Sequence, residues 1–171
     1  VNAHHVDEDL APGIYYYTVF SRDHAGNYSG STTAWVKVGA ASSTQIAGAD
    51  RYATAVLASK KAFPAAGSLS QDPEGHRSVV VATGANWPDA LGGSSLAGAV
   101  GGPILLVKRD VLPAEVAAEI VRLGADRVLL LGGTAAVSAA VATSLDAVSG
   151  IDEVERIGGV DRYETAEKIA A

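Results

Sequence analysis

The sequence predicts a layered α/β domain, in which a mostly parallel sheet is flanked by helices, preceded by an N-terminal β-hairpin. Short apolar segments recur through residues 78–157, and each is followed by a turn and then by a stretch with helical spacing. Apolar strands that do not alternate with polar residues are buried on both faces, and strands separated by helices are normally parallel. Before residue 39 the chain is instead aromatic and β-branched, which predicts the separate hairpin.

The hairpin is expected within residues 1–38. Residues 14–21 and 28–38 have strand composition, and the turn residues 23–27 lie between them. The small and polar residues 39–45 then predict a short flexible linker.

Part of this hairpin resembles a known fold. The run from Leu10 to Phe20, followed by Asp23 and the Gly26–Ser29 stretch, is similar to the last two strands of a fibronectin type III or related immunoglobulin-like domain. Since such sandwiches need about seven strands, the resemblance implies only the C-terminal part of one. The corner tyrosine of that family falls on Tyr15 or Tyr16, and the spacing leaves both open. We expect the histidines of this part to lie on the surface and not to bind metal: His4, His5 and His24.

A ten-residue stretch occurs twice and organises the rest of the chain. Residues 46–55 return as residues 157–166, with Ile, Gly, Asp, Arg, Tyr, Thr and Ala in the same register. Internal repeats of this kind define structural units. The sequence therefore predicts one repeat over residues 46–156 and the truncated start of a second over residues 157–171.

Both copies contain a helix start signal. Asp50 and Asp161 stand at N-cap positions, and Glu164 gives the second copy an acidic capping box. We interpret both aspartates as caps first, with ligand contact as the alternative. Helices are expected at 51–62, at 89–100 with Asp89 as its cap, at 114–123 and at 138–148; strands are expected at 78–82, 104–107, 127–131 and 154–157, and residues 63–77 are expected to form a surface loop.

Four motifs in this region together resemble the putative cell wall-binding repeat 2 family over Thr44–Ala171. They are the repeated Ile-x-Gly-x-Asp-Arg-Tyr-x-Thr-Ala, Thr83–Leu91, Pro103–Leu106 and Val128–Ser138. The resemblance implies a secreted Gram-positive surface-layer or wall protein whose repeats pack around a pseudo-threefold axis and hold an anionic wall polymer non-covalently. It also implies that Ile104, Leu105 and Leu106 form the family's Ile-Leu-Leu signature, which we expect to be buried strand.

Two arginines are the first candidates for polymer binding. Arg51 and Arg162 follow the capping aspartates, and a guanidinium at a helix N-terminus opposes the helix dipole unless it has an anionic partner. A wall-polymer anion or an internal salt bridge would each supply that partner. Tyr52 and Tyr163 are expected to pack at the helix entries.

Polar turns after the strands supply the other candidates. Thr83, Asn86 and Asp89 follow a strand at the edge where parallel sheets form ligand crevices, although turn formation and capping explain Asn86 and Asp89 equally well. Thr134 closes the Gly132-Gly133-Thr134 turn, which offers a rival reading as a phosphate cradle of an enzyme or nucleotide-binding domain. The spacing of a dinucleotide fingerprint, a P-loop or a serine hydrolase is missing.

Composition narrows the function further. The net charge of -6 argues against nucleic-acid binding, the absence of Cys removes disulfides and thiolate metal sites, and no apolar run is long enough to cross a bilayer. We therefore expect no cofactor, no catalysis and no membrane insertion. The sequence predicts a non-catalytic, extracellular wall-anchoring module of a larger protein, with its secretion signal upstream. The alternative to ligand binding is a structural spacer.

Overall fold

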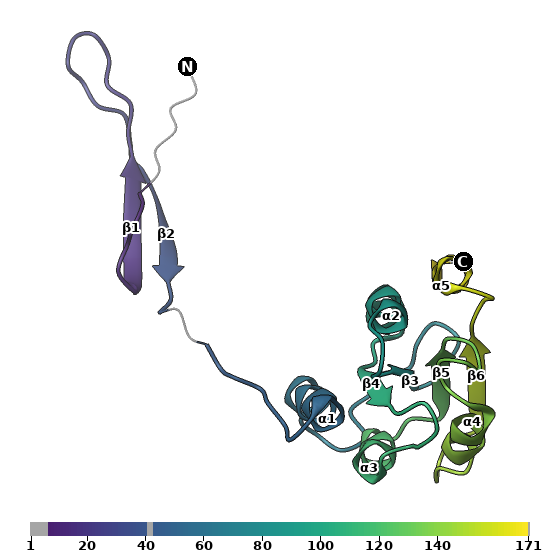
Figure 1. Ribbon diagram of the computed structural model, residues 1–171. Coiled ribbons are helices and arrows are strands. Elements are labelled where there is room, and N and C mark those ends of the chain that lie inside the picture. Colours follow the sequence, from purple (N-terminus) through teal and green to yellow (C-terminus); the bar gives the residue numbers. More distant parts are fainter. Residues whose placement is uncertain (1–6, 41–42, 171) are drawn as a thin grey trace. The chain divides into compact units, whose positions relative to one another are not determined.

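The structure is a computed structural model that describes residues 7–40 and 43–170. Contacts divide the chain into two compact units, residues 1–45 and residues 46–171 (Figure 1). The histidine expectation for His4 and His5 falls outside the described residues, whereas His24 is exposed.

The first unit is an antiparallel hairpin. Strand β1 (Gly13–Val19) pairs with strand β2 (Thr32–Val38) in continuous register from Gly13 opposite Val38 to Val19 opposite Thr32. The second strand starts four residues later than the sequence predicted. Tyr28 forms only an isolated bridge with Arg22, and Ser21 N–H donates to the side chain of Ser29 at 2.9 Å, so the continuous ladder begins at Thr32. The carboxylate of Asp23 closes the predicted turn by accepting from the N–H groups of Ala25 and Asn27, each at 2.9 Å.

Tyr15 makes the contact expected of a corner tyrosine. Its hydroxyl donates a hydrogen bond of 2.8 Å to the carbonyl of Ala11, four residues upstream. Tyr16, the other candidate, points away from that face and is 70% exposed.

The second unit contains a four-stranded, fully parallel sheet in the order β4-β3-β5-β6. Its strands lie close to the predicted ranges: β3 (Ser78–Thr83), β4 (Ile104–Val107), β5 (Arg127–Leu131) and β6 (Glu153–Ile157). The predicted α/β class and parallel sheet are therefore confirmed.

The helices α1 to α5 of the described residues cover the sheet in two layers (Figure 1). Helices α1 (Arg51–Ala62), α3 (Ala114–Leu123) and α4 (Ala139–Asp146) pack on one face, and helices α2 (Pro88–Val100) and α5 (Arg162–Ala170) pack on the other. Helix α4 is shorter than predicted: Ala147 N–H still bonds the carbonyl of Thr143 four residues back, but Val148 N–H bonds that of Leu145 only three residues back, which tightens the chain into a turn.

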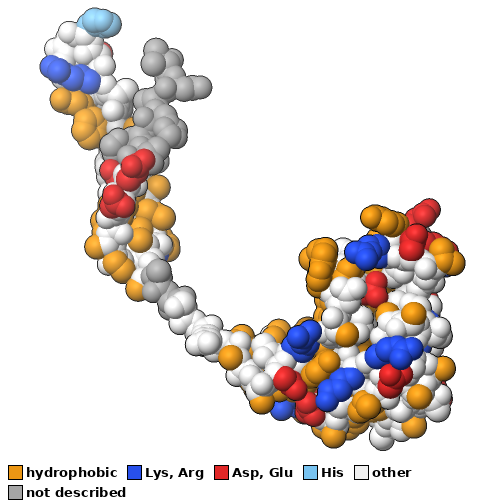
Figure 2. Space-filling model, viewed as in Figure 1, with side chains coloured by type: hydrophobic (Ala, Val, Ile, Leu, Met, Phe, Trp, Pro, Cys, Tyr) orange, Lys and Arg blue, Asp and Glu red, His pale blue; other side chains and the backbone are white. Residues whose placement is uncertain are grey.

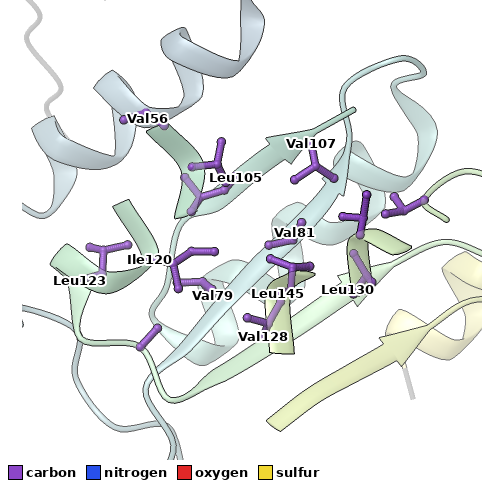
Figure 3. Close-up of a cluster of buried hydrophobic side chains, with 14 of the residues drawn as sticks. Val56, Val79, Val81, Leu105, Val107, Ile120, Leu123, Val128, Leu130 and Leu145 are labelled. Atoms are coloured by element: carbon purple, nitrogen blue, oxygen red, sulfur yellow. The ribbon is translucent and has the colours of Figure 1, made fainter. Parts of the chain in front are cut away.

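Each face of the sheet has its own hydrophobic core. Alternate residues of the central strands point to opposite sides: Val79, Val81, Val128 and Leu130 pack with α1, α3 and α4, as Figure 3 shows, while Val80 and Leu129 pack with α2. All four residues of the first set have no solvent exposure. Strands that are apolar throughout are the sequence signal of this arrangement.

The predicted burial of the Ile-Leu-Leu segment is only partly right. Leu105 is fully buried, but Ile104 and Leu106 are half-buried. Strand β4 lies at the edge of the sheet, and its side chains on the α2 face, Ile104 and Leu106, are therefore only partly covered.

The two copies of the repeated stretch form the same hydrogen bonds. Asp50 Oδ1 accepts from the backbone N–H groups of Tyr52 and Ala53, and Asp161 Oδ1 accepts from those of Tyr163 and Glu164, all at 2.9 Å. Both aspartates are therefore N-caps, as predicted.

The repeated glycine and threonine complete this motif. Thr54 Oγ1 accepts from Gly48 N at 2.9 Å and donates to the carbonyl of Asp50, and Thr165 does the same with Gly159 and Asp161. A Cβ on either glycine would lie within 2.8 Å of the backbone of the following helix, so glycine is required at both places.

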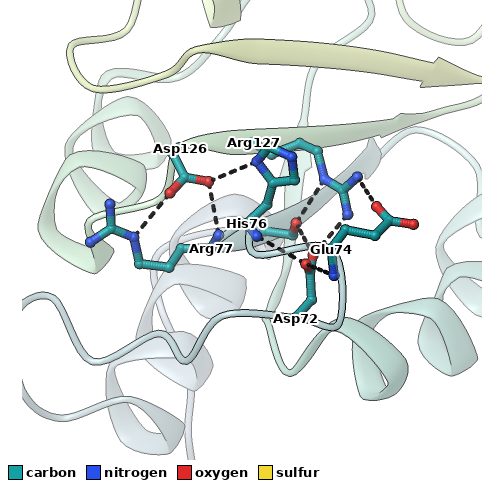
Figure 4. A network of polar contacts seen from close by, with 7 residues as sticks. Asp72, Glu74, His76, Arg77, Asp126 and Arg127 are labelled. Atoms are coloured by element: carbon teal, nitrogen blue, oxygen red, sulfur yellow. Dashed lines mark hydrogen bonds and ion pairs between the residues drawn. The ribbon is translucent and has the colours of Figure 1, made fainter.

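The predicted surface loop, residues 63–77, contains a buried ion-pair network (Figure 4). Arg127 donates to Asp72 at 2.7 Å and to Glu74 at 2.5 Å, and its Nε donates to Ser78 Oγ at 3.0 Å. Asp72 also accepts from Ser78 Oγ and from two backbone N–H groups of its own loop. The network attaches the loop to the amino ends of β3 and β5.

A second buried carboxylate joins α1 to α3. Glu119 is 1% exposed and accepts hydrogen bonds from Ser59 Oγ at 2.6 Å and, through both oxygens, from Arg122 at 2.7 Å. Arg122 also donates to the carbonyls of Phe63 and Ala65, so it ties the start of the loop to the same helices.

Two neighbouring arginines allow the buried network to be tested. We expect Arg127→Ala to lower the free energy of unfolding by about 3–5 kcal/mol, because it leaves the carboxylate of Asp72 buried without its cation. Arg77 pairs with Asp126 near the surface, where its side chain is 46% exposed, so Arg77→Ala should cost less than about 1 kcal/mol. Urea unfolding of both variants measures the difference, and equal losses would contradict the assigned role of the buried pair.

Acid should destabilise the second unit. Burial alone would raise the pKa values of Asp72 and Glu119, but hydrogen bonds and the adjacent Arg127 and Arg122 outweigh burial and hold both pKa values below their ordinary 3.8 and 4.5. The stability from these groups is complete above those ordinary values and is lost as pH falls through the lower folded values. We expect the urea midpoint to fall between pH 6 and pH 3, and to fall less in Asp72→Asn, which has no such proton to bind. A urea midpoint that does not change with pH would show that neither carboxylate contributes to the stability of the unit.

Candidate functional site

A polar cleft lies at the carboxyl ends of the parallel strands. The connection from β3 runs through α2 to one side of the sheet, and the connection from β5 runs through α4 to the other side. Neighbouring strands whose connections diverge leave a crevice between their carboxyl ends. A cleft of about 370 Å³ occupies this place. We call it the carboxyl-end cleft; the residues that line it are Thr83, Ala85, Asn86, Pro88, Asp89, Arg109, Gly133, Ala135, Ala136, Gly159, Val160, Asp161, Arg162 and Thr165.

Closely packed glycine backbone forms one side of the cleft. A Cβ on Gly158 would lie 2.7 Å from the carbonyl carbon of Gly132 and 2.8 Å from Gly133 N, so the loops after β5 and β6 touch through their main chains. Gly132 has a φ of +94°, which favours glycine. The loop between β5 and α4 is also held by Arg156 of β6, whose Nη1 donates to the carbonyls of Gly132 and Val137 at 2.8 and 2.9 Å.

Charges of both signs lie around the cleft. Arg109 donates to the carbonyl of Ala135 at 3.0 Å and pairs with Asp110 at 3.4 Å. The side chain of Arg162 makes no hydrogen bond or ion pair with any residue that the structure describes, and it is exposed. On the visible face of the second unit, basic and acidic side chains are interspersed (Figure 2).

Asp89 was predicted to cap a helix, and this is wrong. Helix α2 begins at Pro88, its N-cap position is Trp87, and no side chain caps it. Asp89 lies in the first helical turn, where its carboxylate packs against Gly132, 2.6 Å from the place of a Cβ there. Because the proline ring supplies the φ angle that starts the helix, no capping side chain is needed. Asp89 thus faces the carboxyl-end cleft, where its half-buried carboxylate makes no hydrogen bond to a described residue.

The predicted polymer-binding residues do not all share one site. Thr83, Asn86, Asp89 and Arg162 line the carboxyl-end cleft. Arg51 instead lines an adjacent cavity of about 330 Å³, which shares Thr83, Ala85 and Asn86 with the cleft. Thr134 is exposed and lines neither one, since the turn directs it outward.

Neither arginine forms, with any residue that the structure describes, the salt bridge that was its alternative. Arg51 donates from Nη1 to the carbonyl of Gly84, at the end of β3, and thereby meets a partial negative charge. Arg162 has no equivalent partner among the described residues. The two copies of the motif therefore fold alike locally but differ in what their arginines contact.

The two tyrosines differ in the same way. Tyr52 packs at its helix entry as predicted, against Gly84 and beneath the ammonium group of Lys108, 5.6 Å from the ring centroid. Tyr163 is 78% exposed, so its predicted packing is not observed. No turn equivalent to that of Gly84 lies beside it in the described part of the chain.

The Gly132-Gly133-Thr134 turn does not fit a phosphate cradle. A cradle needs free backbone N–H groups followed directly by a helix N-terminus. Gly132 N donates to the carbonyl of Ile157 at 2.8 Å, and five residues separate Gly133 from the start of α4 at Ala139. The turn therefore lacks the directly following helix start that a phosphate cradle requires.

Arg109 is the cleft residue that sequence reasoning missed. It follows β4 just as Thr83 ends β3, so the rule that placed Thr83 in the cleft could have placed Arg109 there too. Arg156 and the Asp72–Arg127 pair gave no sequence signal, because their partners are distant in the chain or are backbone carbonyls.

Residues 7–40 and 43–170 contain no helix long and apolar enough to cross a membrane. Over the same ranges, no group of three or more His, Asp and Glu side chains could hold a metal ion.

A parallel sheet covered on both faces, with a polar cleft at its switch point, defines the class of α/β ligand-binding modules. The chain matches the family described as Cell wall binding domain 2 (CWB2) over residues 45–142, and it belongs to that family. It is therefore a cell-wall-binding module, and this membership implies a location at the cell wall or surface.

The chain is also similar to two proteins of known name. The chain is 30% identical over 126 residues to N-acetylmuramoyl-L-alanine amidase LytC of Bacillus subtilis (strain 168), covering 74% of this chain and 23% of that protein. It is also 30% identical over 126 residues to the Amidase enhancer of the same strain, covering 74% of this chain and 16% of that protein.

The fold is also similar to those of two solved structures. Cwp6 from Clostridium difficile matches with a TM-score of 0.65 and 29% identity, over 90% of this chain and 22% of that one. Cwp8 from the same organism matches with a TM-score of 0.66 and 26% identity, over 96% and 30%. The chain thus spans less than a third of each of these four proteins.

The contact between the glycine loops gives a test of how the cleft is built. We expect Gly158→Ala to lower the free energy of unfolding by about 1–3 kcal/mol, because its methyl group would meet main-chain atoms of Gly132 and Gly133 that cannot rotate away. Gly98→Ala is the matched control: a Cβ there meets nothing within 4 Å on α2, so it should gain about 0.5–1 kcal/mol. Thermal melts measure both variants. If the melting temperature of Gly158→Ala is not below that of the wild type, the two loops are not in close contact.

Proposed function

We propose that the chain is a non-catalytic anchoring module that holds an anionic cell-wall polymer, a secondary wall polysaccharide or a teichoic-acid-like polymer, in the carboxyl-end cleft. The observation that carries the proposal is the unpartnered guanidinium of Arg162 at a polar cleft, in a chain that belongs to a cell-wall-binding family. A guanidinium binds phosphate or carboxylate through two parallel hydrogen bonds.

The mixed charge of the cleft suits a charged saccharide better than a simple anion. Arg109 and Arg162 can bind an acidic group, while Asp89 has a carboxylate free to accept hydrogen bonds from sugar hydroxyls. Asp161 contributes less, since its Oδ1 already caps α5. With a net charge of -6, long-range attraction to a polyanion is weak, so binding depends on these local contacts.

The names of the relatives suggest the setting of such a module. Two are an amidase and an amidase enhancer, and the chain spans only part of each. We propose that the chain belongs to a larger secreted bacterial protein, in which other regions carry any catalytic activity and neighbouring repeats pack against this one. Residues 1–38 are proposed to be the last strands of a fibronectin type III-like domain, which the hydrogen bond from Tyr15 to Ala11 supports.

Wall binding tests the proposal. The purified chain should sediment with Bacillus subtilis strain 168 cell walls and should remain in solution when the anionic polymers have first been extracted from those walls. Salt should weaken the binding, because charge-assisted contacts near the surface are screened. Equal binding to intact and extracted walls would exclude an anionic polymer, and no binding to either would favour a structural spacer.

Arginine variants test the site. Arg162→Ala should weaken binding by about 1.5–3 kcal/mol, as expected for a charge-assisted hydrogen bond, and should leave the melting temperature unchanged because the side chain contacts no described partner. Arg51→Ala should weaken binding and also lower the melting temperature, because it loses the bond to Gly84. Arg77→Ala, at the opposite end of the strands, is the control and should bind normally. Normal binding by both Arg51→Ala and Arg162→Ala would place the polymer elsewhere.

A further inference from the structure

Trp87 is an exposed aromatic side chain beside the proposed polymer site. It occupies the N-cap position of α2, and 68% of its surface is exposed. Within the described residues, its indole N–H donates no hydrogen bond and its ring packs against no other aromatic ring. Folding therefore gives this large apolar surface little burial, which makes it available for a ligand.

Trp87 forms part of the cavity next to the carboxyl-end cleft. This cavity of about 330 Å³ combines an apolar side, from Trp87, Ala90 and Leu106, with polar groups from Asn86 and Arg51. Its size and mixture of surfaces fall within the usual range of small-molecule sites, roughly 300–1,000 Å³. Leu106 is available to it because β4 is an edge strand.

The polar groups of this cavity keep unused hydrogen-bond donors. Asn86 accepts from the backbone N–H of Trp87 through Oδ1 at 3.1 Å, so its amide NH₂ remains free of described partners. Arg51 uses Nη1 for the carbonyl of Gly84, and the other N–H groups of its guanidinium make no hydrogen bond to a described residue. Donors beside an aromatic face suit a pyranose ring, which has C–H groups on its faces and hydroxyls around its edge.

The two cavities are adjacent, because Thr83, Ala85 and Asn86 line both of them. A polymer chain bound in the carboxyl-end cleft would need to extend past Asn86 to reach Trp87. The charged residues Arg109 and Arg162 line the first cavity, and the aromatic ring lines the second.

We propose that Trp87, Asn86 and Arg51 form a saccharide subsite, in which a pyranose ring of the wall polymer stacks on Trp87 while its neighbouring anionic group lies in the carboxyl-end cleft. This inference rests on the proposed function. It assigns Trp87 a binding role and gives Arg51 a second one besides its contact with Gly84.

The chain offers a direct reporter for this subsite. It contains two tryptophans, Trp35 on the hairpin at 67% exposure and Trp87 at 68%. With excitation selective for tryptophan, the emission of Trp35→Phe comes from Trp87 alone, and that of Trp87→Phe comes from Trp35 alone. The ligand is the anionic polymer extracted from Bacillus subtilis strain 168 walls, and polyphosphate serves as a probe with charge but no sugar ring.

The wall polymer should shift the emission of Trp35→Phe to shorter wavelength and protect it from acrylamide, while polyphosphate should do neither. Trp87→Phe should bind with unchanged emission, because the phenylalanine ring still stacks and Trp35 lines neither cavity. Trp87→Ala should lose affinity about tenfold or more, measured by sedimentation with intact walls. Trp35→Ala should lose none.

Unchanged Trp87 emission at saturating polymer, an equal change with polyphosphate, or wild-type affinity in Trp87→Ala would each overturn the subsite while leaving the proposed function in place. Failure of the wild-type chain to bind the polymer at all would overturn both the subsite and the proposed function. The fluorescence titration needs no substitution at position 87, so it remains decisive even if Trp87→Ala folds poorly.

Discussion

The second unit depends on one constraint, which is that both faces of its parallel sheet must be covered. Strands such as β3 have apolar side chains on both faces, and parallel neighbours can be joined only by crossovers long enough to contain a helix. Helices therefore pack on each side and build two separate cores. Once α2 and α4 lie on opposite faces, the connections that leave the carboxyl ends of the paired strands β3 and β5 must diverge, and the cleft follows from the covering of the sheet.

The repeated stretch shows how one local structure serves two surroundings. Its Gly, Asp and Thr form the same hydrogen bonds in both copies, which explains why these residue types recur. Its Arg and Tyr reach beyond the motif. In the first copy they close over the turn at Gly84, and in the second Arg162 lines the cleft while Tyr163 is exposed. A repeated sequence thus fixes the start of a helix but does not fix the contacts of its outward side chains.

The same distinction separates what could be predicted from what could not. Strand and helix positions came from periodicity, and the caps Asp50 and Asp161 came from spacing, because both are local properties. Burial at β4 could not be read from three apolar residues, since it depends on which strand lies at the edge. The misplaced cap at Asp89 has the same cause, because the direction of a turn residue depends on the loop that packs against it.

The ion-pair network at the opposite end of the sheet explains how the cleft can carry unpaired charge. Asp72 and Arg127 fix the long loop to the amino ends of β3 and β5, and Glu119 and Arg122 join that loop to α1 and α3. These buried charges are satisfied by several partners each, so their loss is costly. At the carboxyl ends, Arg51, Arg109 and Arg156 donate to backbone carbonyls of the loops and form no comparable buried ion-pair network among the described residues. Arg162 and Asp89 can therefore keep free hydrogen-bonding groups toward the cleft, because the stability of the unit does not depend on them.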